Sequence, residues 1–304
     1  MEETKQLPIA KLGWMGIGRM GYAMARRLGE AGADIAVYNR SANKAKPLAE
    51  YGVKLASGVR DLAACDIVFT MLSTGDVVKD SLFGPQGLIQ AGQSKPKLVV
   101  DCSSISLEVS AEIRSLCAAQ GINFLAAPIS GNPHVVEEGL ASFVVSGERD
   151  SFEGLRPFLL AIGRAASYVG EGELARVAKI CHNVWLGALT QSLAEVVVLA
   201  QKAGMTRAAF MDFLNGSALG STYTRVKTPH WVALDFSATF TPALMRKDMD
   251  LGIHLAQELG ATLPLATITR DLLQSLINRG IVDEDFSALL LQQAEASGLK
   301  MTRE

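Results

Sequence analysis

The chain has 304 residues, 49% of them hydrophobic and 20% charged, so it is too apolar to be disordered and long enough for two ordinary domains. Its formal net charge of −2 argues against a nucleic acid or an anionic membrane as a partner. The charged first residues do not fit a secretory signal, and four scattered cysteines without a CxxC pair favour a reducing cytoplasm over a disulfide or zinc framework.

The first half of the sequence alternates short apolar runs with helical patterns, which is typical of βαβ units around a parallel sheet. The predicted strands cover residues 11–15, 34–38, 67–71, 98–101 and 123–126. Predicted helices fall between them, for example at 20–31 and 107–120. Two further strand-like runs, at 142–146 and 166–169, are expected to continue this sheet.

After residue 170 the β-branched runs almost vanish and helical periodicity dominates. The helical periodicity of residues 173–203 predicts a single helix, far longer than the average helix of roughly 11–12 residues. Asn183, Gln191 and Glu195 interrupt its apolar surface, so we interpret it as a protein-packed helix and not a membrane span. Thr241 followed by Pro242 predicts the start of another helix.

These patterns predict an α/β fold. A Rossmann-type, doubly wound sheet domain at residues 1–170 would bind a nucleotide, and an all-α domain at 171–304 would follow it, joined by the long helix. We expect the functional site between the two domains.

A glycine-rich loop follows the first predicted strand and opens the next helix. Its GxGxxG spacing allows a tight turn, close approach of the backbone to a pyrophosphate, and close packing of helix on strand. The helix start then offers N–H groups to the phosphates. We expect dinucleotide binding by Gly16, Ile17, Gly18, Arg19, Met20 and Gly21.

The turn after the second strand indicates which dinucleotide is bound. NAD-binding proteins place an acid here, about 20 residues past the glycines, to hold the ribose 2′-hydroxyl. This chain has Asn39, Arg40 and Ser41 instead. A guanidinium and a hydroxyl can bind a 2′-phosphate, and no carboxylate repels it. The sequence therefore predicts NADP (NADPH) as the cofactor.

Five motifs in chain order resemble the beta-hydroxyacid dehydrogenase family, which is related to the 6-phosphogluconate dehydrogenases. They are GIGRMGYAMA from residue 16, DCSS at 101–104, APISG at 127–131, KICHN at 179–183, and KD at 247–248. The substrate loop departs from the family pattern, with Ala126 in place of an acid, Asn132 in place of a glycine, and valines at 135–136. These departures leave the substrate open.

The resemblance implies a chemistry. Lys179 would be the general acid/base, passing a proton to or from the reacting oxygen, and Asn183 would hydrogen-bond that oxygen. Lysine can fill this role where desolvation and nearby positive charge lower its pKa. His182 either touches the substrate or is a core histidine. The loop of Ser130, Gly131 and Asn132 would bind the substrate carboxylate.

Residues that end strands, or that come late in the chain, complete the expected cofactor site. The carboxyl ends of parallel strands form the ligand edge of such sheets. Leu72, Ser73 and Thr74 follow one strand there and would line the cofactor path; the resemblance places Ser104 near the nicotinamide and brings Lys247 to the cofactor. Phe240 either packs near the nicotinamide or belongs to the core. No histidine pattern predicts a metal.

The expected function is interconversion of a small β-hydroxy acid and its aldehyde or keto acid. Compounds of the 3-hydroxyisobutyrate, tartronate semialdehyde, glyoxylate and succinic semialdehyde type all remain open. The weakly charged long helix predicts a homodimer or homotetramer. The alternatives are an imine reductase of the same fold, which usually has another residue where Lys179 stands, and a non-catalytic NADP-binding protein. The spacing Tyr223-x-x-x-Lys227 also occurs in short-chain dehydrogenases, but it lies outside the predicted sheet domain.

Overall fold

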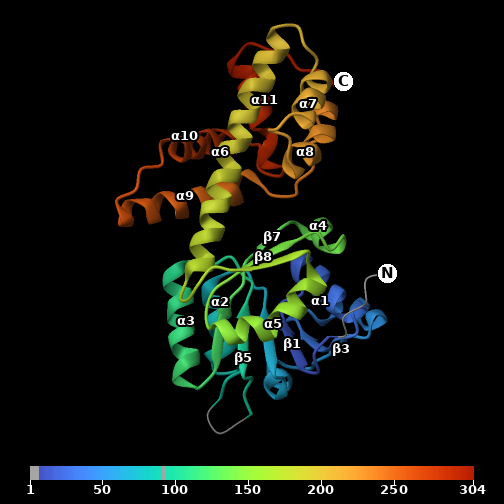
Figure 1. The fold of residues 1–304 in the computed structure, drawn as a ribbon, viewed down its shortest axis with the longest axis vertical. Coiled ribbons are helices and arrows are strands. Elements are labelled where there is room, and N and C mark those ends of the chain that lie inside the picture. Colours follow the sequence, from blue (N-terminus) through green and yellow to red (C-terminus); the bar gives the residue numbers. More distant parts are fainter. Residues whose placement is uncertain (1–6, 91–93) are drawn as a thin grey trace. The chain divides into compact units, whose positions relative to one another are not determined.

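The computed structural model describes residues 7–90 and 94–304. The start of the chain, on which the expectation about a secretory signal rests, lies outside these ranges. The chain divides into two compact units, Met1–Lys179 and Ile180–Glu304, which we call the sheet unit and the helical unit. Figure 1 shows the strands confined to the first unit and long helices dominating the second.

The sheet unit is built on a six-stranded sheet in the order β3-β2-β1-β4-β5-β6. Every neighbouring pair in it is parallel, which confirms the predicted doubly wound fold. Its strands are β1 (Lys11–Met15), β2 (Asp34–Tyr38), β3 (Lys54–Leu55), β4 (Ile67–Thr70), β5 (Leu98–Asp101) and β6 (Asn123–Ala126).

Helices cover both faces of this sheet. Side chains alternate along β1, so that Trp14 packs into one core and Met15 into the other. The first core includes α1 and α5, and the second includes α2 and α3. The helices of this unit are α1 (Arg19–Glu30), α2 (Gly75–Phe83), α3 (Leu107–Ala119), α4 (Pro133–Glu137) and α5 (Arg149–Ile162), with short 3-10 helices at Ala42–Lys44, Lys46–Tyr51 and Val59–Ala64.

The expectation that the late strand-like runs continue the sheet is wrong. They form β8 (Ser142–Val145) and β9 (Ala165–Tyr168), which join β7 (Ile129–Ser130) in a separate three-stranded sheet. A parallel return to the main sheet is usually made through a full crossover helix. The connection after β6 contains only β7 and the five-residue α4, and β7 pairs with β8 in antiparallel fashion.

The helical unit is assembled around residues 180–202 of α6 (Leu174–Lys202), which closely matches the predicted long helix and begins in the sheet unit. Its core joins buried side chains of α6 to Trp231 and Met249. The remaining helices are α7 (Arg207–Gly216), α8 (Thr222–Ala233), α9 (Pro242–Leu259), α10 (Pro264–Asn278), a 3-10 turn at Phe286–Ala288, and α11 (Leu289–Ala296). As predicted, α9 begins with Thr241 capping and Pro242 in its first turn.

By length and composition α6 is apolar enough to cross a membrane, and 44% of its most apolar window is buried. A core helix passes the same test, and the polar groups of α6 are used inside the protein. The amide of Gln191 donates to Glu195 on the same helix and to Gln293, at 2.9 and 3.0 Å. Such bonds favour the interpretation of α6 as a core helix.

Candidate cofactor and substrate site

The glycine loop between β1 and α1 is shaped by close backbone approaches. Gly16 has a φ of +100°, and a Cβ there would lie 2.3 Å from the carbonyl oxygen of Met71. A Cβ on Gly21 would lie 2.0 Å from the carbonyl oxygen of Gly16. At Gly18, in contrast, no atom of the described residues lies within 4 Å of the Cβ position. The loop therefore leaves open space at its middle glycine, as binding of a pyrophosphate requires.

The side chain of Asn39 connects this loop to the turn after β2. Its Oδ1 accepts a hydrogen bond from the backbone N–H of Ile17 at 2.9 Å, and its Nδ2 donates to the carbonyl oxygen of Ser41 at 3.0 Å. Arg40 and Ser41 are exposed beside it. Lys44, which we did not predict as a site residue, adds an exposed cation four residues after Arg40. The turn can therefore bind a phosphate with two cations.

The predicted cofactor path lies at the carboxyl ends of β4 and β5, which pair in parallel. The backbone N–H of Leu72 donates to the hydroxyl of Ser103 at 2.9 Å, which ties the loop after β4 to the loop that contains Ser104. Ser73 follows Leu72, and Thr74 caps α2 with its hydroxyl oxygen. The two loops are thus held together by a hydrogen bond within the protein itself.

A buried ion pair lies at this same edge. The guanidinium of Arg176, in the first turns of α6, pairs with the carboxylate of Asp101 at the end of β5, and both side chains are almost completely buried. The sequence indicated Asp101 only as part of a motif and did not single out Arg176. An arginine among apolar residues in the first turns of the helix was the available signal.

The predicted substrate loop follows β7. Gly131 has a φ of +143°, a conformation that favours glycine. The Oδ1 of Asn132 accepts the backbone N–H of Val135 at 3.0 Å and so caps α4. The Asn132 oxygen is therefore occupied by the helix, and its amide N–H₂ is the group suited to a carboxylate. Ser130 is half-buried at the end of the strand.

On α6, a hydrogen-bonded row begins one turn after Lys179. The Nδ1 of His182 lies 2.8 Å from the Oδ1 of Asn183, and the Nδ2 of Asn183 donates to Asp248 at 2.5 Å. Since an amide oxygen only accepts, the Nδ1 of His182 is the donor in this contact. The other oxygen of Asp248 lies 3.3 Å from the Nζ of Lys247. Asp248 was missed as a site residue, although the KD motif included it.

Phe240, which the sequence left between two roles, packs on the core of the helical unit. Its ring meets the ring of Phe286 edge-on, with centroids 6.0 Å apart. Its backbone N–H donates to Asp285 at 3.3 Å. This packing fixes the chain directly before α9, whose N-cap is Thr241. That Phe240 contacts a nicotinamide stays a prediction.

The Tyr-x-x-x-Lys spacing belongs to the interior of the helical unit. The hydroxyl of Tyr223 lies 2.6 Å from that of Thr190, and burial raises the pKa of Tyr223. The ammonium of Lys227 donates to Asp285 at 2.6 Å. Burial alone would raise the pKa of Asp285, but Lys227 and several hydrogen bonds outweigh it and lower that pKa. Because both groups are used in internal bonds, a short-chain dehydrogenase site is not supported.

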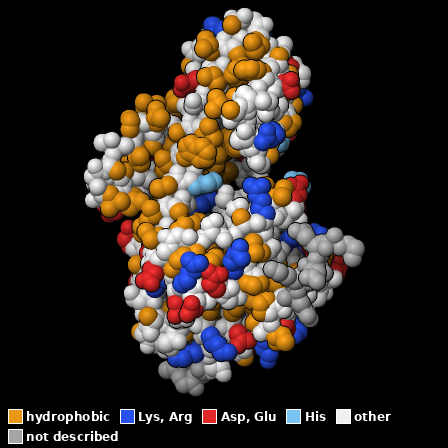
Figure 2. Space-filling model, viewed as in Figure 1, with side chains coloured by type: hydrophobic (Ala, Val, Ile, Leu, Met, Phe, Trp, Pro, Cys, Tyr) orange, Lys and Arg blue, Asp and Glu red, His pale blue; other side chains and the backbone are white. Residues whose placement is uncertain are grey.

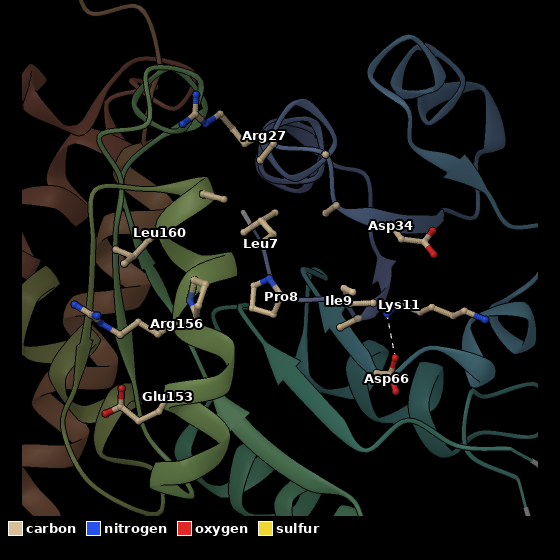
Figure 3. Close-up of a pocket in the computed structure, with 16 residues that line it drawn as sticks. Leu7, Pro8, Ile9, Lys11, Arg27, Asp34, Asp66, Glu153, Arg156 and Leu160 are labelled. Carbon is tan, nitrogen blue, oxygen red and sulfur yellow. Dashed lines mark hydrogen bonds between the residues drawn. The ribbon is translucent and has the colours of Figure 1, made fainter. Parts of the chain in front are cut away.

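Figure 3 shows a hollow at the opposite end of the sheet, where β1, β2 and β4 begin. Pro8, Ile9 and Arg156 line it, and the backbone N–H of Lys11 donates to Asp66 at 3.0 Å. None of the predicted site residues lines this hollow. Within residues 7–90 and 94–304, His, Cys, Asp and Glu form no group of three suited to a metal ion.

Comparison with known families covers nearly the whole chain. Residues 11–170 match the NAD binding domain of 6-phosphogluconate dehydrogenase, and residues 173–292 match the NAD-binding region of NADP-dependent 3-hydroxyisobutyrate dehydrogenase. The chain is 31% identical over 286 residues to the chloroplastic glyoxylate/succinic semialdehyde reductase 2 of Arabidopsis thaliana, covering 94% of this chain and 80% of the relative. It is also 31% identical over 270 residues to the 3-hydroxyisobutyrate dehydrogenase of Pseudomonas aeruginosa, covering 86% and 90%.

Solved structures agree with these matches. The 3-hydroxyisobutyrate dehydrogenase of Mycobacterium tuberculosis is 27% identical, with a TM-score of 0.80 over 94% of this chain and 99% of that one. An imine reductase from Myxococcus stipitatus, at 21% identity and a TM-score of 0.59 over 94% and 99% of the two chains, shares the fold alone. The resemblance noted from the motifs is thereby confirmed: the chain belongs to the beta-hydroxyacid dehydrogenase family of nicotinamide-dependent oxidoreductases.

Proposed function

We propose that this chain is an NADP(H)-dependent enzyme that interconverts a small β-hydroxy acid and its aldehyde or keto acid, with Lys179 as the general acid/base. The observation that carries the proposal is the row on α6. An amide at Asn183, held on one side by His182 and on the other by Asp248, lies one helical turn after Lys179. A fixed amide donor beside a lysine suits an oxygen that gains or loses a proton.

Each residue has one task in this proposal. The cofactor, when bound, supplies or accepts the hydride. In the reducing direction, Lys179 donates a proton to the carbonyl oxygen, which becomes the hydroxyl of the product. Asn183 keeps one amide hydrogen on Asp248 and offers the other to the same oxygen. The N–H groups after Ser130 and the amide of Asn132 bind the carboxylate. In the oxidising direction, Lys179 takes the proton from the alcohol.

The fit of the dinucleotide rests on the open Cβ position at Gly18 and on α1, whose start has no side-chain cap. Arg19 and Met20 begin that helix. The loops of residues 72–74 and 103–104 would line the nicotinamide end. Lys247 and Phe240 of the helical unit are proposed as further contacts.

The turn after β2 leads to a prediction about cofactor choice. NADPH is expected to bind about tenfold or more tightly than NADH, because Arg40, Ser41 and Lys44 can pair with the 2′-phosphate. Arg40→Ala should narrow that difference without changing NADH affinity. Fluorescence titration of both cofactors measures it, with Arg149→Ala on α5 as the control. Equal affinities in the unmodified protein would contradict the assignment.

The proposed reaction is tested by a screen of NADPH oxidation. Small aldehyde and keto acids such as glyoxylate, succinic semialdehyde and tartronate semialdehyde form one set, and 3-hydroxyisobutyrate with NADP tests the reverse direction. Cyclic imines form the second set. Turnover of imines but not of acids would favour the imine reductase alternative, and no turnover in either set would favour a non-catalytic NADP-binding protein.

We also propose that the protein works in the cytoplasm as a homodimer or homotetramer. Of the described large hydrophobic residues that are exposed, most lie in the helical unit, and on α6 they include Trp185 and Leu199, 64% and 69% exposed. Figure 2 shows hydrophobic side chains gathered over this unit, whereas charged side chains are spread over the surface of the sheet unit. Such a surface is usual where chains associate. Sedimentation should give a mass of at least two chains, and Trp185→Glu should lower it.

A further inference from the structure

The first turns of α6 are tied to the sheet through one buried arginine. The Nη2 of Arg176 donates to Asp101, its Nη1 donates to the carbonyl oxygen of Ser103, and its Nε donates to the hydroxyl of Ser110 at 3.1 Å. Arg176 is 2% exposed and Asp101 is 0% exposed. One guanidinium therefore joins α6 to β5, to the loop after β5, and to α3.

The carboxylate of Asp101 has further partners. Its other oxygen accepts the hydroxyl of Thr70 at 2.6 Å and the backbone N–H of Ser103 at 3.2 Å. The hydroxyl of Ser103 in turn accepts the N–H of Leu72. The ends of β4 and β5, and both loops predicted to line the nicotinamide, thus belong to the network that holds α6.

Arg176 precedes Lys179 by three residues, so the two side chains leave α6 from adjacent positions on the same side. Rotation or sliding of the helix would move Lys179 by ångströms relative to residues 72–74 and 103–104. A buried ion pair is weak evidence for added stability, because the cost of desolvation offsets the attraction. The ion pair does, however, restrict the position of the arginine, because the planar guanidinium of Arg176 donates to Asp101, Ser103 and Ser110 at the same time.

We propose that Arg176 and Asp101 are positioning residues that set the rotation and height of α6 so that Lys179 reaches the reacting oxygen. This inference rests on the proposed role of Lys179. It assigns to a residue outside the family motifs the task of aligning the acid/base with the cofactor edge of the sheet.

The test compares variants that differ in geometry and in charge. Arg176→Lys keeps the cation beside Asp101 but cannot reach the carbonyl oxygen of Ser103 and the hydroxyl of Ser110 from the same group. The pair Asp101→Asn with Arg176→Gln removes both buried charges. Arg207→Lys is the matched control, because Arg207 is also a buried arginine but binds the carbonyl oxygens of residues 231, 232 and 302.

Kinetics provides the first readout. Both site variants should lower kcat about tenfold or more. The Kd for NADPH should stay within about threefold, and the isotope effect with deuterated NADPH should rise because the chemical step becomes limiting. Arg207→Lys should leave all of these unchanged. If kcat stays normal in Arg176→Lys, or recovers in the uncharged pair, the positioning role is refuted.

Hydrogen exchange of the cofactor-free protein provides a second readout, independent of activity. The Arg176→Lys variant and the uncharged pair should exchange about tenfold faster at residues 174–180, 72–74 and 103–104, and Arg207→Lys should not. Unchanged exchange at these segments would overturn the inference. If Lys179→Ala retains activity, the proposed function fails instead, and the exchange result still decides whether the network holds α6.

Discussion

Replacing Lys179 by alanine is expected to lower turnover at least a hundredfold while NADPH still binds. General acid/base catalysis by a positioned side chain contributes about 10²–10⁴-fold, and this loss falls on the chemical step, not on cofactor affinity. Stopped-flow measurement of hydride transfer, with the NADPH Kd measured separately, distinguishes a slower chemical step from weaker cofactor binding. The expected pattern is a large fall in kcat with the Kd nearly unchanged.

Two further variants sharpen this result. Lys179→Arg keeps the positive charge but does not release a proton near neutral pH, so it should be almost as inactive as the alanine variant. Lys202→Ala removes a lysine from the other end of the same helix, where its Nζ donates to the carbonyl oxygen of Ser297 at 2.7 Å. It should turn over normally. Near-normal turnover in Lys179→Ala would exclude Lys179 as the acid/base.

Replacing Gly18 by alanine is expected to weaken NADPH binding by about tenfold or more without destabilising the fold. The Gly18 backbone has φ −76° and ψ −176°, which alanine adopts readily, and its Cβ position is open. Folding stability should therefore stay level or rise by roughly 0.4–1 kcal/mol. A methyl group there would instead meet the approaching pyrophosphate. Denaturant unfolding and cofactor titration on the same preparation measure both quantities.

Two other glycines provide the comparison. Gly154→Ala in α5 has equal open space and should leave cofactor affinity unchanged. Gly21→Ala should destabilise the sheet unit, because its Cβ would lie 2.0 Å from a backbone oxygen. Should Gly18→Ala bind NADPH as tightly as the unmodified chain, the dinucleotide does not approach this loop as proposed.

Local patterns were enough to predict five of the six strands of the main sheet and the long helix, whereas the two-residue edge strand β3 was missed. The apolar runs at β1, β4, β5 and β6 are largely buried on both faces, β2 alternates between buried and partly exposed residues, and α6 has a helical pattern without a proline. The pairing of β7 with β8 could not be predicted in this way. A short run has the same apolar pattern whichever neighbour it joins, and the partner depends on how the connecting segment folds back.

Side-chain partners far apart in sequence escaped prediction for a similar reason. Asn39 was predicted to bind the cofactor, yet its oxygen accepts a bond from the backbone N–H of Ile17. Asn132 was assigned to substrate, yet its oxygen caps α4. A polar residue at a loop has many candidate partners within reach, and only the folded backbone decides among them.

The amino-acid sequence by itself determined the class of fold, the glycine loop and the family, because each depends on residue types at short, regular spacings. Tertiary structure alone decided that Arg176 meets Asp101 across 75 positions and that Asn183 is held by Asp248 across 65. Such bonds form only after packing has excluded water and brought strand ends and helix sides together. Buried polar groups then require partners that no local pattern specifies.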